Sequence, residues 1–110
     1  MSRRALLLVH TNAAGPDKED EYHRWYDEVH IPQLLERVPG IVRAARYLAS
    51  PEGPPVSERN LAIYEIEADD PAAVLREINK AAASGRLDFT SAMDASTPPV
   101  MALYEPAHLG

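Results

Sequence analysis

Residues 21–32 read Glu21-Tyr-His-Arg-Trp-Tyr-Asp-Glu-Val-His-Ile-Pro32. Consecutive residues of an α-helix are about 100° apart around its axis, so the side chains of Trp25, Tyr26 and Val29 lie within roughly 60° of Tyr22. This spacing predicts a helix with an aromatic stripe along one side. Such a stripe must pack against another element, which indicates a folded domain around this helix.

The surrounding residues predict where this helix begins and ends. Acidic residues at positions 17–21 favour a helix start, because the helix dipole attracts negative charge at its N-terminus. We expect the helix to run to about His30. Pro32 lacks a backbone N–H, and it fits the first turn of a second helical piece, Pro32–Val38. The dipeptide Pro39-Gly40 then ends that piece.

Three polar residues lie on one flank of the aromatic stripe: His23, Asp27 and His30, at positions i, i+4 and i+7. They could bind a metal ion, or they could form ordinary contacts on a solvated helix face. The His-Glu-x-x-His pattern is absent and no fourth ligand is evident, so we expect no metal. His30 alone could carry protons, because imidazole titrates near neutral pH. It could also bind a backbone carbonyl at the helix break.

Four short apolar runs predict strands. They are Ala5–His10, Ile41–Ala49, Asn60–Ile66 and Val100–Tyr104. A second helix is predicted between the cap Asp69-Asp70-Pro71 and Gly85, followed by an irregular segment, 86–99, anchored by Phe89 and Met93. The order strand, helix, strand, strand, helix, strand predicts an α+β fold of the ferredoxin-like type. In that fold, two helices lie on one face of a four-stranded antiparallel sheet.

Both faces of the predicted sheet are apolar. In the first strand, Leu6 and Leu8 lie on one face, and Leu7 and Val9 lie on the other. The two helices cover only one face, and a second copy of the chain would cover the other. We therefore expect a homodimer joined through its sheet faces.

Composition and charge exclude several functions. The chain of 110 residues has the size of one domain, residues 1–110, and carries 11 basic and 17 acidic residues, a net charge of -6. No basic face is evident for nucleic acid, and the acidic helix would be repelled by anionic membranes. The absence of cysteine excludes disulfides, thiolate metal sites and a cysteine nucleophile. No apolar run has the length of a membrane span or secretory signal, so we expect a cytoplasmic protein.

Segment 21–32, together with Val38-Pro-Gly40 and Arg46-Tyr47, resembles the EthD-like families of the dimeric α+β barrel superfamily. Those proteins typically carry Trp-Tyr, a histidine and a proline on the first helix, then Val-Pro-Gly and a strand with Arg-Tyr. The resemblance implies a ferredoxin-like protomer, a dimer, and a ligand pocket between helices and sheet. It implies no single reaction, because the wider superfamily includes cofactor-free monooxygenases, polyketide cyclases, lactone isomerases and haem-dependent enzymes.

Histidine and aromatic side chains supply the candidate site. Besides His30, His10 at the end of the first strand could act as an acid or base, or be an ordinary strand-end residue. A tyrosine can donate a hydrogen bond to a substrate carbonyl, or be a core residue with its hydroxyl at the edge. The candidate substrate-binding residues are Trp25, Tyr26, Tyr47 and Tyr64. Arg46 could hold a carboxylate, but pairing with an acid such as Glu65 is the favoured interpretation.

The sequence favours a small enzyme without a cofactor. A hydrophobic aromatic or polyketide-like substrate would bind in the pocket. His30 or His10 would move a proton next to a carbonyl, for cyclisation, isomerisation or oxygenation of an enolate. A non-catalytic ligand-binding or accessory protein is the alternative, and haem bound by a histidine is a third hypothesis. Gly-x-Ser-x-Gly, phosphate-binding glycine loops and dinucleotide fingerprints are absent from the sequence, which excludes the chemistry that they support.

Overall fold

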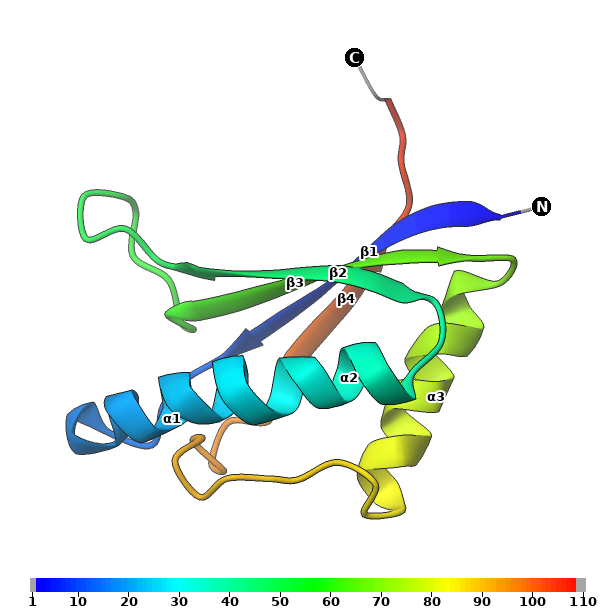
Figure 1. The fold of residues 1–110 in the computed structure, drawn as a ribbon. Helices are drawn as coiled ribbons and strands as arrows, with labels where there is room; N and C mark the ends of the chain where they lie inside the picture. The colour runs from blue at the N-terminus through cyan, green and yellow to red at the C-terminus, as the bar shows by residue number, and fades with distance from the viewer. Residues whose placement is uncertain (1, 109–110) are drawn as a thin grey trace.

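A four-stranded antiparallel sheet forms the centre of the molecule, with strand order β2–β3–β1–β4 (Figure 1). The strands are β1 (Arg3–Thr11), β2 (Ile41–Leu48), β3 (Asn60–Ala68) and β4 (Val100–Tyr104). Their bounds differ from the expected ones by no more than two residues at either end. This computed structural model describes residues 2–108. The expected ferredoxin-like α+β fold is confirmed.

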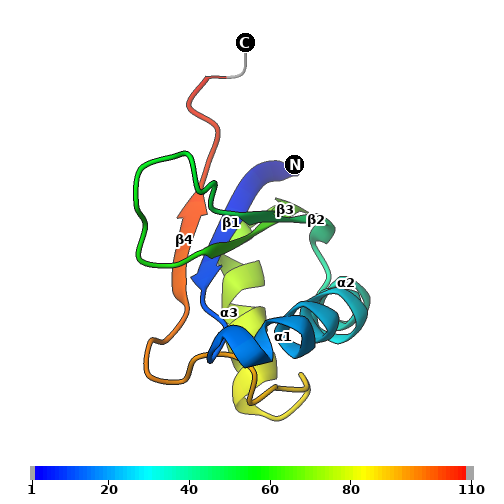
Figure 2. The same ribbon diagram turned by 90° about the vertical axis from the view of Figure 1, so that its left-hand side faces the viewer.

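All helices lie on the same side of the sheet (Figures 1 and 2). The helical segment between β1 and β2 comprises a short turn (Pro16–Lys18), α1 (Glu19–Trp25), a π turn (Tyr26–His30) and α2 (Ile31–Arg37). The helix between β3 and β4 is α3 (Pro71–Ala83). None of the helices in residues 2–108 has the length and hydropathy needed to cross a membrane.

The helix break expected between His30 and Pro32 is replaced by a π turn, and the helix continues through it (Figure 1). The N–H of Ile31 bonds to the carbonyl of Tyr26, five residues earlier. Pro32 accounts for this geometry, because it has no N–H to donate and its ring would clash with the carbonyl of Glu28, four residues earlier. Widening the turn by one residue accommodates the proline, and such π turns are frequent at functional sites.

The core lies between the sheet and the helices. Alternate residues of β1 and β3 point into it, as the burial pattern of each strand shows. The aromatic stripe expected on the first helix also faces this core. Tyr22, Trp25 and Tyr26 are buried, and Val29 is partly buried against them.

The segment between α3 and β4 differs from the expectation at one of its two anchors. Met93 packs against the core, but Phe89 is 70% exposed, so the prediction for Phe89 is wrong. Leu87 and Ala92 are the buried residues of this segment. Its backbone is fixed beside the end of β1, because the N–H of Ala14 bonds to the carbonyl of Ala92 at 2.6 Å. The segment thereby forms one wall of the space beneath the sheet.

The face of the sheet away from the helices carries apolar side chains, as expected. We call it the open sheet face. Its residues include Leu6, Leu8, His10, Tyr47, Leu61, Ile63, Val100 and Tyr104. Tyr47 and Tyr104 are 56% and 55% exposed. No helix within residues 2–108 covers this apolar surface, because α1, α2 and α3 all lie on the other side of the sheet (Figure 1).

Gly40, in the turn between α2 and β2, has φ +101°, and a Cβ atom there would lie 2.8 Å from Cγ2 of Val74. We expect Gly40→Ala to lower the free energy of unfolding by about 1–3 kcal/mol, since alanine is strained at this φ and Val74 must move. Gly85 also has a positive φ, +76°, with nothing within 4 Å of its Cβ position. Gly85→Ala is therefore the control for strain alone. Equal losses for both variants in urea unfolding would show that the contact with Val74 costs nothing.

Candidate functional site

A cavity of about 100 Å³ lies between the helices and the sheet. Its walls come from β1, the first helical segment, β3, α3 and the segment that leads into β4. Its lining is largely apolar and contains no Asp, Glu, Lys or Arg. The polar lining residues are Thr11, Trp25, Tyr26, His30, Tyr64 and Asn79. An apolar cavity with a few polar groups is the usual form of a small-molecule site.

His30 reaches the cavity from the end of the π turn. Its ring stacks on Trp25, with the centroids 4.5 Å apart and the planes inclined by 18°. The centroid of the Tyr26 ring lies 5.2 Å from that of His30, with the two planes nearly perpendicular at 89°. In an α-helix, a residue five positions on would lie ~140° further around the axis. The extra residue in the π turn therefore brings His30 beside Trp25 rather than onto the flank of the helix.

Burial keeps the His30 imidazole uncharged at neutral pH. It lowers the pKa of His30 from 6.5 to about 4, because the imidazolium would lose its hydration in this apolar place. A neutral imidazole donates a hydrogen bond from one nitrogen and accepts one at the other. The His30 ring can therefore bind an uncharged polar group of a ligand in the cavity.

Among residues 2–108, two buried side-chain polar atoms lack a hydrogen-bond partner: Nδ1 of His30 and the hydroxyl of Tyr64. Both residues line the cavity. Burial raises the pKa of Tyr64, and the nearby Tyr26 hydroxyl raises it further, by repulsion and by a weak contact in which Tyr64 donates without the geometry of a full hydrogen bond. Burial also raises the pKa of Tyr26, to about 12. Both phenols therefore stay protonated at pH 7 and can donate.

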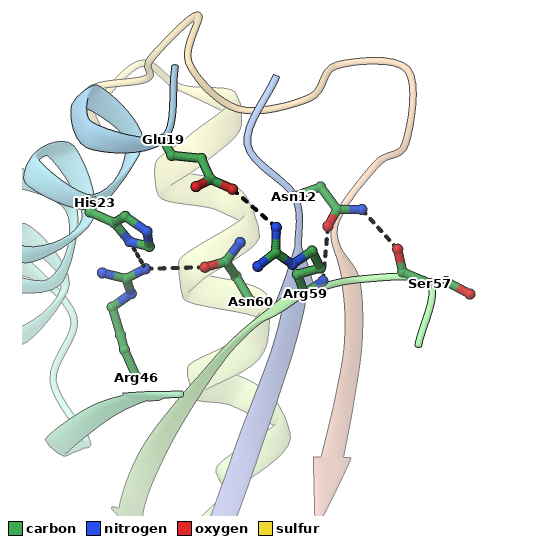
Figure 3. A network of polar contacts seen from close by, with 7 residues as sticks. All are labelled: Asn12, Glu19, His23, Arg46, Ser57, Arg59 and Asn60. Carbon is green, nitrogen blue, oxygen red and sulfur yellow. Dashed lines mark hydrogen bonds and ion pairs between the residues drawn. The ribbon is translucent and has the colours of Figure 1, made fainter. Parts of the chain in front are cut away.

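Arg46 on β2 packs against the tyrosines of the first helix. Its guanidinium carbon lies 4.7 Å from the ring centroid of Tyr26 and 5.6 Å from that of Tyr22. Its Nη1 donates to Oδ1 of Asp27 at 2.8 Å, and its Nη2 lies 2.8 Å from Nδ1 of His23. Figure 3 shows this contact with His23, and a longer one to Asn60. Arg46 therefore ties the first helix to the sheet.

Arg46 pairs with an acid as expected, but the acid is Asp27 and not the suggested Glu65. Glu65 pairs with Arg43 at 3.4 Å, not with Arg46, because alternate residues of β2 point to opposite faces of the sheet. His23 and Asp27 both contact Arg46, whereas His30 stacks on Trp25, so the three do not converge. No group of His, Asp and Glu side chains in residues 2–108 has the arrangement of a metal site.

A larger hollow of about 490 Å³ lies at one end of the open sheet face. Its charged residues are all paired: Arg4 with Glu67 at 3.5 Å, Arg43 with Glu65 at 3.4 Å, and Glu105 with Arg3 outside the hollow. Neither of the two unpaired buried atoms found in residues 2–108 belongs to it. We therefore place the candidate site in the smaller cavity, which is lined by the two residues that carry these atoms, His30 and Tyr64.

No protein-family model matches the sequence, and no curated protein matches it. Solved structures do match the fold. A candidate monooxygenase from Shewanella loihica PV-4 has a TM-score of 0.59 and 14% identity, covering 99% of each chain. An EthD-like protein from Ralstonia eutropha JMP134 has a TM-score of 0.58 and 14% identity, covering 96% of this chain and 93% of its own. The chain has the fold of the EthD-like proteins.

An EthD family protein from Bacillus halodurans C-125 has the same fold, with a TM-score of 0.53 and 18% identity. That match covers 94% of this chain and 98% of the other. The resemblance seen in the sequence is thus confirmed by EthD-like proteins among the structures that match. At these identities the likeness concerns the fold, and the chemistry must be argued from the residues in the cavity.

Four of the six candidate residues meet in the cavity of this EthD-like fold: Trp25, Tyr26, His30 and Tyr64. The other two lie elsewhere. His10 pairs with Leu61 and Tyr47 also pairs with Leu61, which places both on the open sheet face. Because the helices lie on the other side, neither His10 nor Tyr47 reaches the cavity.

Two polar residues that line the cavity, Thr11 and Asn79, were not among the candidate residues predicted from the sequence. Asn79 lies four residues after Leu75 and three before Ala82, which are partly buried on the same side of α3, so this helical spacing could have indicated it. Thr11 ends β1, and its hydroxyl bonds to that of Tyr22. Its position on the same side of β1 as Leu7 was the available signal.

Proposed function

We propose that this protein is a small enzyme of the cofactor-free monooxygenase type, acting on a hydrophobic aromatic or polyketide-like substrate. The observation that carries the proposal is the pair of unpaired polar groups, on His30 and Tyr64, in a cavity without charged side chains. The candidate monooxygenase from Shewanella loihica PV-4, which has the same fold, supports the choice of reaction.

The proposed mechanism needs only a dry cavity, a donor and a base. Tyr64 donates a hydrogen bond to the substrate oxygen, and neutral His30 accepts a phenolic proton as the ring reacts. The electron-rich phenolate then reacts with O2. One oxygen atom forms the new C=O of a quinone, and the other leaves as water with the two hydrogens that the phenol loses. The substrate supplies the electrons, so the reaction balances without an added reductant.

A ligand-binding or accessory protein without turnover is the second candidate. The pKa of His30, about 4, favours it, because a general base works best when its pKa is near the working pH. In that case the same residues would hold the ligand, and no bond would change.

Oxygen uptake with 1-naphthol tests the proposal, since its conversion to 1,4-naphthoquinone follows the balance given above. We expect the wild type to consume oxygen and His30→Ala to lose that activity. His108 is exposed in the tail, so His108→Ala is the matched control and should keep the wild-type rate. Binding without oxygen uptake would favour the second candidate. A loss confined to His10→Ala would move the site to the open sheet face.

We also propose that a second copy of the chain covers the open sheet face. The central positions of this face are apolar, with Leu8 and Ile63 paired across β1 and β3. Exposed apolar patches of this kind mark contact surfaces in soluble proteins. A self-complementary contact between two such faces would form a closed dimer.

A further inference from the structure

Size, charge and polar groups together restrict what the cavity can hold. A closed apolar cavity of about 150 Å³ holds one benzene ring. The cavity here, about 100 Å³, therefore encloses no more than one ring. Any larger ligand must extend through its opening.

The exposure of the lining residues shows which end of the cavity is closed. Tyr64 is 1% exposed and its hydroxyl is buried, so we place this hydroxyl at the closed end. Phe89 and Met101 also line the cavity and are 70% and 40% exposed, so they lie where it opens to solvent. A ligand that enters past Phe89 and Met101 presents its leading ring to Tyr64.

The lining also disfavours negatively charged ligands. It includes no cationic side chain that could pair with a carboxylate. Placing an unpaired anion in such an apolar space is strongly unfavourable. His30 is uncharged at pH 7 in the free protein, because burial lowers its pKa to about 4, so it presents no positive charge to an incoming carboxylate.

We propose that the cavity binds an uncharged aromatic molecule through one terminal hydroxylated ring, whose oxygen accepts a hydrogen bond from Tyr64. This inference rests on the proposed function and narrows its substrate class. It excludes aromatic carboxylates. It also excludes polycyclic molecules whose only oxygen lies on a central ring, because that oxygen could not reach the closed end.

Four probes test the proposal by isothermal titration calorimetry: 1-naphthol, naphthalene, 1-naphthoate and anthrone. We expect 1-naphthol to bind at least 100-fold more tightly than 1-naphthoate, which has a similar shape but a negative charge. Anthrone, with its oxygen on the central ring, should bind at least tenfold more weakly than 1-naphthol. Equal affinities for 1-naphthol and either of these two probes would overturn the proposal.

The variant Tyr64→Phe tests the hydrogen bond. The Tyr64 hydroxyl makes no hydrogen bond of good geometry in the free protein, only a weak contact with Tyr26, so its removal should cost little folding stability. We expect Tyr64→Phe to weaken 1-naphthol binding about fivefold to tenfold and to leave naphthalene binding unchanged. An equal loss for both ligands would show that Tyr64 only shapes the wall, and would overturn the proposal.

These binding results separate the inference from the proposed function. If 1-naphthol binds through Tyr64 and consumes no oxygen, the inference stands and the oxygenase proposal fails. If anthrone is bound and oxidised more readily than 1-naphthol, the oxygenase proposal stands and the inference fails. If none of the four probes binds, the inference is wrong.

Discussion

Lowering the pH from 7 to 4 is expected to remove about 3 kcal/mol from the free energy of unfolding through His30 alone. The pKa of His30 is about 4 in the folded protein, because burial disfavours its charged form, and its ordinary value is 6.5. Between these two values the unfolded chain binds more protons than the folded protein, so stability increases with pH. This contribution is complete above pH 6.5 and is lost as the pH falls toward 4.

Urea unfolding between pH 4 and pH 7 measures this effect. His30→Phe keeps an aromatic ring against Trp25 but cannot titrate, so its stability should depend less on pH than that of the wild type. His108→Phe alters an exposed histidine and should retain the wild-type slope. Identical slopes for His30→Phe and the wild type would mean that His30 is not buried in its neutral form.

A charge at the centre of the open sheet face is expected to convert the proposed dimer into monomers. Ile63 lies on this face, opposite Leu8 of β1 and Ala45 of β2. In a dimer, Ile63→Glu would bury two carboxylates without partners, which costs far more than one apolar contact contributes. Native mass spectrometry should give twice the 12.1 kDa monomer mass for the wild type and the single mass for the variant.

Leu35→Glu is the control for this experiment, because Leu35 is 42% exposed and belongs to α2, which packs on the other side of the sheet (Figure 1). It introduces the same charge away from the open sheet face and should leave the dimer intact. Far-UV circular dichroism of Ile63→Glu checks that the variant is folded. A wild-type protein that is monomeric at micromolar concentration would refute the dimer.

The order of elements could be predicted because the apolar spacing distinguishes strands from helices along most of the chain. The position of His30 could not be predicted in this way. A helical wheel assumes about 100° per residue, and the π turn before Pro32 breaks that assumption. The wheel therefore placed His30 on the flank with His23 and Asp27, whereas the structure stacks it on Trp25.

The sequence could not show which strand residues face the helices, for a different reason. Alternation correctly placed Arg43 and Arg46 on opposite sides of β2. It could not tell which side the helices cover, because the strands are apolar on both sides. His10 and Tyr47 were therefore candidates, although they lie on the open sheet face. Phe89 lies in a segment without periodicity, where no pattern indicates burial.

Proton NMR distinguishes a ligand site at His30 in the cavity from one at His10 on the open sheet face. The chain has four histidines, whose Hε1 signals can be followed by proton NMR and assigned with single variants. On addition of 1-naphthol, we expect the His30 signal to shift and those of His10, His23 and His108 to stay unchanged. A shift of the His10 signal with none at His30 would contradict this expectation.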